Sequence, residues 1–85
     1  MENQTTKQTI IELIAQQTGL DSEVIDPTLN FEEDLGLTEE DLVTLIKQIN
    51  HSFEDINLHL DDLTENSVYT VGGLVQLVND ELAFA

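Results

Sequence analysis

Apolar residues recur at helical spacing in three segments of this chain. Steps of three and four residues place them on one face of a helix, which buries that face against a core. The spacing therefore predicts amphipathic helices over 6–18, 38–52 and 70–82. The three stripes are Ile10, Ile11, Leu13 and Ile14; Leu42, Leu45, Ile46, Ile49 and Phe53; and Val71, Leu74, Val75, Leu77, Val78 and Leu82.

Helix boundaries are also marked in the sequence. Gly19 follows the first stripe and suits the residue after a helix, where a positive φ is common. Thr38 precedes the second stripe, with Asp41 three residues later, which is typical of a capping box. Gly72 and Gly73 fall in the first turn of the last helix, so we expect close backbone packing there.

The segments between the helices keep apolar residues without helical spacing. Residues 20–37 contain an Asp26-Pro27 turn signal together with Val24, Ile25, Leu29, Phe31, Leu35 and Leu37, which predicts a long loop held against the core. Residues 56–60 alternate like a strand, but the chain offers no partner strand, so we expect an extended connector. A short helical turn is expected within 61–67. The prediction is one all-α domain over 1–85, a small antiparallel four-helix bundle with three long helices, one short helix and a long first loop.

Composition narrows the function classes. The 85 residues include 18 Asp and Glu against 2 Lys and Arg, a net charge of −16, and no cysteine. Disulfides and thiolate zinc sites are therefore excluded. The polar start at 1–9 is unlike a signal peptide, and no apolar run approaches the ~18 residues of a membrane span. We expect a cytoplasmic monomer that avoids nucleic acid and anionic membranes and binds basic protein surfaces.

Metal-binding and catalytic patterns are weak. The acidic runs 32–34 and 61–62 lack the alternating ligands and central glycine of an EF-hand loop. His51 and His59 have neither a cysteine nor a second histidine at zinc-binding spacing, and both are expected at the surface. With no nucleophile–base constellation and no phosphate loop, we expect neither a specific metal site nor an enzyme.

Several motifs, in order, resemble acyl carrier proteins and the carrier domains of polyketide and nonribosomal peptide synthases. The stretch Phe31-Glu-Glu-Asp-Leu-Gly36 resembles the segment before the second helix of that family. Residues 10–20 resemble its first helix and exit, and Thr70-Val71-Gly72-Gly73-Leu74 resembles the start of its last helix. The resemblance implies a carrier of acyl or aminoacyl groups in fatty-acid, polyketide or nonribosomal peptide biosynthesis.

The resemblance also implies a site at the start of the second helix. Carriers of this family have Asp-Ser-Leu there, and the serine bears 4′-phosphopantetheine. This chain has Thr38-Glu39-Glu40, with Glu39 at the position of the serine. Partner enzymes of the family read the same helix, which here presents Glu40, Asp41, Val43, Thr44 and Lys47.

Two functions remain open from the sequence. The first is a carrier with a variant attachment motif, for which Thr38 is the nearest hydroxyl, although a role as helix N-cap accounts for it. The second is an interaction module without the phosphopantetheine arm, which keeps the carrier fold and docks basic partner proteins.

Overall fold

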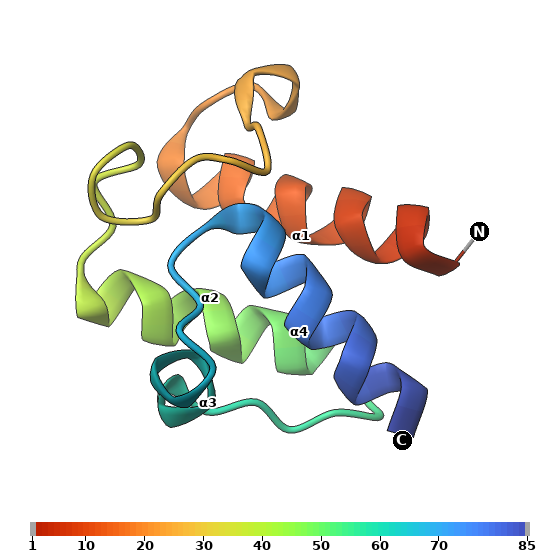
Figure 1. Ribbon diagram of the computed structural model, residues 1–85. Coiled ribbons are helices and arrows are strands. Elements are labelled where there is room, and N and C mark those ends of the chain that lie inside the picture. The colour runs from red at the N-terminus through yellow and green to blue at the C-terminus, as the bar shows by residue number, and fades with distance from the viewer. Residues whose placement is uncertain (1, 85) are drawn as a thin grey trace.

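Four α-helices and one short 3₁₀ turn make up the structure, a computed structural model that describes residues 2–84. In chain order they are α1 (Glu2–Thr18), η1 (Ser22–Val24), α2 (Glu39–Ser52), α3 (Leu60–Glu65) and α4 (Val71–Phe84). Figure 1 shows α1 running in the opposite direction to α2 and α4, with the short α3 beside α2. The predicted all-α bundle with three long helices is confirmed. No helix of the described residues is long and apolar enough to cross a membrane.

The three predicted stripes supply much of the core, and the first loop, the connector, α3 and the segment before α4 supply the rest. Ile10 and Ile14 of α1 and Ile49 of α2 are fully buried. Each such side chain contributes roughly 1.5–3 kcal/mol by leaving water. Helix α1 begins at Glu2, earlier than the predicted start at residue 6. The prediction missed this turn because the first residues of the helix are polar and carry no apolar period. The rest of the buried apolar set is Ile25, Phe31, Leu37, Leu45, Ile46, Ile56, Leu58, Leu63, Val68, Val71, Leu74, Val75 and Val78.

The long first loop is held against the core, as predicted, with one exception. Ile25, Phe31 and Leu37 are buried, but Val24 is 58% exposed. The expectation that Val24 belongs to the anchored set was wrong. The 3₁₀ turn η1, which the sequence did not reveal, ends at Val24 and directs Ile25 inward, so its neighbour faces solvent.

Backbone hydrogen bonds fasten this loop to the start of α4. The Gly72 N–H donates to the Pro27 carbonyl at 2.8 Å, and the Val71 N–H donates to the Leu29 carbonyl at 3.1 Å. An isolated antiparallel bridge joins Asn30 and Thr70 without extending into a sheet. A Cβ at Gly72 would lie 3.1 Å from the Pro27 oxygen, so the predicted close backbone packing is confirmed at Gly72, whereas the nearest atoms at Gly73 belong to side chains.

The connector before α3 is extended, and within residues 2–84 no strand pairs with it. Ile56 and Leu58 are buried, while Asn57 and His59 are exposed. The side-chain amide of Asn50 takes the place of a strand: its Oδ1 accepts the Leu58 N–H at 2.7 Å, and its Nδ2 donates to the Leu58 carbonyl at 2.8 Å. One side chain from α2 therefore satisfies both backbone groups of a buried extended residue.

Candidate functional site

The start of α2 is closed by the predicted capping box. The Asp41 N–H donates to the Thr38 Oγ1 at 3.2 Å, and the Thr38 N–H donates to the Asp41 carboxylate at 3.0 Å. The Thr38 carbonyl accepts the Leu42 N–H at 3.0 Å. The role of Thr38 as N-cap is confirmed, and its hydroxyl oxygen is engaged with the helix backbone.

Glu39 and Glu40 occupy the first two positions of the helix and are exposed. Carboxylates are stabilised there by the positive end of the helix dipole. The described part of the chain provides no acceptor for the N–H groups of these two residues. The first turn of α2 therefore presents free N–H groups and carboxylates to solvent, and no hydroxyl beyond that of Thr38.

A shallow hollow on the exposed side of α2 collects most of the predicted recognition residues. Its lining is Glu39, Glu40, Val43, Thr44 and Lys47. Val43 is half-buried and supplies the apolar base, while the other four are exposed. The Thr44 hydroxyl donates to the Glu40 carbonyl at 3.1 Å, which leaves its methyl group for the surface. Asp41 is not part of this lining, because its carboxylate is committed to the cap.

The approach to α2 is fixed by two features. The acidic stretch 30–37 folds into a compact turn in which the Asn30 Oδ1 accepts the N–H groups of Glu32 and Glu33. The Leu37 N–H then donates to the Phe31 carbonyl at 2.8 Å. From α1, the Gln17 Nε2 donates to the Asp41 carbonyl at 2.6 Å, a positioning contact that the sequence did not suggest.

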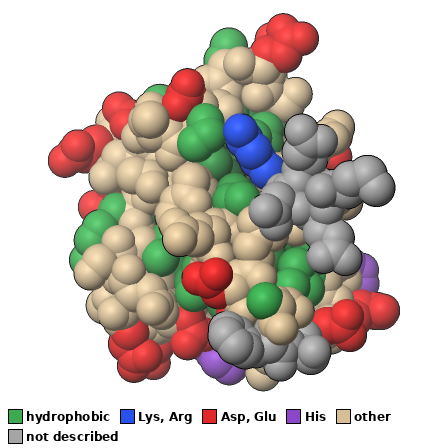
Figure 2. Space-filling view, turned by 45° about the vertical axis from the view of Figure 1, so that its right-hand side comes forward, with side chains coloured by type: hydrophobic (Ala, Val, Ile, Leu, Met, Phe, Trp, Pro, Cys, Tyr) green, Lys and Arg blue, Asp and Glu red, His purple; other side chains and the backbone are tan. Residues whose placement is uncertain are grey.

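Acidic side chains are spread widely and do not mark the site by themselves. Figure 2 shows carboxylates distributed over one face, with hydrophobic atoms between them. Within the described residues, no group of three or more His, Cys, Asp or Glu side chains is placed to hold a metal ion. His51 and His59 are both exposed, at the last turn of α2 and at the start of α3.

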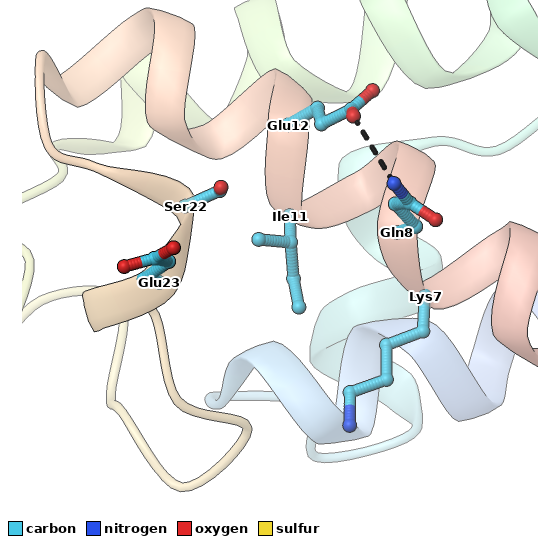
Figure 3. Close-up of a pocket in the computed structure, with 6 residues that line it drawn as sticks. All are labelled: Lys7, Gln8, Ile11, Glu12, Ser22 and Glu23. Atoms are coloured by element: carbon cyan, nitrogen blue, oxygen red, sulfur yellow. Dashed lines mark hydrogen bonds between the residues drawn. The ribbon is translucent and has the colours of Figure 1, made fainter.

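A second hollow lies between α1 and η1 and has mixed charge. Ile11 extends into it, Lys7 and Glu12 flank it on α1, and Ser22 and Glu23 line it from η1 (Figure 3). Figure 3 also shows the Gln8 amide reaching toward Glu12, to which it donates a weak hydrogen bond of 3.5 Å. The opposite charges in this lining favour no single kind of ligand.

Asp26 lies in the loop beyond η1, directly before Pro27. Hydrogen bonds from the Thr28 backbone N–H and hydroxyl hold the pKa of Asp26 below its usual value, and the charge of Lys7 adds to the effect. The two bonds measure 2.9 and 2.8 Å. This carboxylate therefore has a structural role in the turn before Pro27.

Comparisons with known proteins identify the family. The family model for the phosphopantetheine attachment site matches residues 8–78. An acyl carrier protein of Syntrophobacter fumaroxidans is 34% identical over 62 residues, which span 73% of this chain and 73% of that protein. Members of this family are carriers without catalytic activity of their own, and they interact with biosynthetic enzymes. The chain belongs to the phosphopantetheine-attachment family that includes the acyl carrier proteins.

Proposed function

We propose that this chain is a carrier-family domain, spanning 1–85, that docks to basic surfaces of biosynthetic enzymes without carrying a phosphopantetheine arm. The observation behind the proposal is the chemistry at the start of α2. By resemblance, Glu39 occupies the position of the attachment serine, and a carboxylate has no hydroxyl with which to form the phosphodiester. The serines of the chain, Ser22, Ser52 and Ser67, all lie outside the first turn of α2.

Glu39 also supplies what a phosphate would supply to the helix. The N-terminus of a helix favours an anion through its free N–H groups and its dipole. Here the negative charge of Glu39, next to that of Glu40, is built into the chain. The domain can therefore keep the fold and the acidic docking helix of a carrier without modification.

A carrier with a variant attachment residue is the second candidate, and one observation favours it. Thr38 is exposed and places a hydroxyl directly before α2. Against this candidate, the Thr38 oxygen accepts the Asp41 N–H, and the methyl group on its Cβ crowds attack by that oxygen. If this candidate held, the pathway would be fatty-acid, polyketide or nonribosomal peptide synthesis.

Mass spectrometry separates the two candidates. The wild-type protein, incubated with coenzyme A and a permissive phosphopantetheinyl transferase, is expected to gain no arm. The triple variant Thr38→Asp, Glu39→Ser, Glu40→Leu rebuilds the Asp-Ser-Leu motif and keeps a capping residue, and it is expected to be modified. An arm on wild-type Thr38 would overturn the proposal. A triple variant that also stays bare would show that the turn before Thr38 differs in shape from that of modified carriers.

Docking through α2 is tested with the same transferase as binding partner. Glu40→Lys reverses one charge in the hollow without touching the capping box, so it is expected to slow association and weaken its salt dependence. Glu65→Lys, an equal charge change at the exposed end of α3, serves as the matched control. Equal effects of the two changes would point to net charge rather than to a docking surface on α2.

A further inference from the structure

A pocket with an apolar base and an acidic rim lies between α2, α3 and the segment that leads to α4. Its base is formed by Leu42 of α2, Leu60 and Leu63 of α3, and Val68. Leu63 and Val68 are buried, and Leu42 and Leu60 pack against the core from partly exposed positions. The rim carries the exposed side chains of Glu32, Glu39, Thr64 and Tyr69.

The two acidic residues of this rim come from different parts of the chain, and the backbone of each is held in place. The backbone of Glu39 belongs to the first turn of α2. The backbone of Glu32 is held by the loop, because the Phe31 N–H donates to the Tyr69 carbonyl at 2.9 Å and the Glu32 N–H donates to the Asn30 side chain at 2.9 Å. Because Glu32 directly follows Phe31, the Phe31–Tyr69 hydrogen bond also brings Glu32 near Tyr69. None of the described residues that line the pocket is basic.

Size and charge together define what fits. The pocket has a volume of about 220 Å³, below the ~300–1,000 Å³ of typical small-molecule sites. A short aliphatic stem would cover its apolar base. A cation at the end of that stem would meet Glu32 and Glu39 at the rim, where Tyr69, which is 56% exposed, offers an aromatic ring for a cation–π contact. A neutral chain would instead cover two carboxylates without providing a partner for them, which is unfavourable.

We infer that this pocket receives a lysine or arginine side chain of the partner protein, with its aliphatic stem against Leu42, Leu60, Leu63 and Val68 and its cation between Glu32 and Glu39. The inference rests on the proposed docking to basic partners and adds a second contact beside the hollow on α2. Glu39 lines both sites, whereas Glu40 lines only the hollow. This difference supplies a matched pair of variants.

The probe is n-butylammonium chloride, which reproduces the side chain of lysine. It is titrated into the ¹⁵N-labelled protein and followed by NMR, with butanol, sodium butyrate and ammonium chloride as controls for the stem, the wrong charge and the charge alone. Saturable shifts at the Leu63, Val68 and Tyr69 amides are expected for n-butylammonium only. Glu32→Gln and Glu39→Gln are each expected to weaken this binding about threefold, the size of an exposed ion pair. Glu40→Gln is expected to leave it unchanged.

Each alternative result overturns the inference. Equal binding of butanol or butyrate would define an apolar site, and equal shifts with ammonium chloride would define general charge screening. Weakening by Glu40→Gln as large as by Glu39→Gln would place the contact on the hollow instead. The titration does not involve the arm or the transferase. A wild-type protein that acquires an arm but still saturates with n-butylammonium would refute the proposed function and leave the pocket standing.

Discussion

Helices α2 and α4 begin in the same way in sequence and differently in space. Each has a threonine cap: the Thr38 Oγ1 accepts the Asp41 N–H, and the Thr70 Oγ1 accepts the Gly73 N–H at 3.1 Å. At α4 the N–H groups of Val71 and Gly72 donate to the loop carbonyls of Leu29 and Pro27. At α2 the N–H groups of Glu39 and Glu40 meet no acceptor within the described part of the chain.

The difference shows how one local motif serves two purposes. The first turn of α4 is apolar and glycine-rich, so the long loop can lie directly on it and close it off from solvent. The first turn of α2 is acidic, and burying its carboxylates without a partner would cost free energy, so it stays exposed. The start of α4 is covered by the loop, whereas the start of α2 stays exposed to solvent. Three predictions test this contrast, from the largest expected effect to the smallest.

The closed end of α4 depends on the absence of a side chain at Gly72. Gly72→Ala brings a Cβ to 3.1 Å from the Pro27 oxygen and 3.2 Å from the Pro27 Cβ, so the loop must shift. Gly73→Ala is the matched control, because its Cβ meets side-chain atoms of Thr70 and Val68 at 3.3 Å or more. Both changes gain the same helix propensity, so the difference between them compares the contact with the Pro27 backbone at 3.1 Å and the contact with the Thr70 hydroxyl at 3.3 Å.

We expect Gly72→Ala to be less stable than Gly73→Ala by about 1–3 kcal/mol, the usual cost of overpacking. Each kcal/mol corresponds to a melting temperature lower by roughly 4–8 °C in a domain of this size. Thermal unfolding followed by circular dichroism measures the difference. Equal melting temperatures for the two variants would show that the loop is not fastened by contact at Gly72.

The caps themselves are the second test. Thr38→Ala removes the acceptor for the Asp41 N–H and is expected to cost about 1 kcal/mol, which Thr38→Asp should restore. Thr70→Ala is expected to leave the Gly72 N–H protected, because the Pro27 carbonyl still accepts it. Amide hydrogen exchange measures both. Rapid exchange at Gly72 in Thr70→Ala would mean that the cap, and not the loop, closes this helix end.

Periodicity was enough to predict the three long helices, apart from the polar first turn of α1, because apolar stripes at steps of three and four residues fix both the element and its buried face. The grouping of Glu40, Val43, Thr44 and Lys47 came from the family resemblance, and their spacing of three, four and seven residues places them on one side of the helix. Contacts between distant segments left no such pattern.

Three such contacts could not be predicted from the sequence. The Asn50 side chain accepts the Leu58 N–H, and the Gln17 side chain donates to the Asp41 carbonyl at the start of α2. Glu32, from the first loop, lines the pocket between α2 and α3. Each contact depends on which distant segment the folded chain brings near, and Asn, Gln and Glu are mostly found at exposed positions, so their identity alone does not predict such a contact.

The smallest expected effect concerns Asp26, at the loop side of the closed α4 end. Its pKa is lower in the folded state than the ordinary value of 3.8, so its contribution to stability is present above that value and is lost as the pH falls through the folded pKa. NMR titration of the Asp26 carboxyl should therefore give a midpoint below 3.8 in the wild-type protein.

Thr28→Val removes the hydroxyl donor and should raise the midpoint, while Lys7→Gln should raise it less, because the hydrogen bonds of Thr28 outweigh the charge of Lys7. In both variants the Thr28 N–H still donates to the carboxylate, so the midpoint should stay below the ordinary value. A larger change in Lys7→Gln than in Thr28→Val would mean that charge, rather than the hydrogen-bonded turn, holds this end of the loop in place.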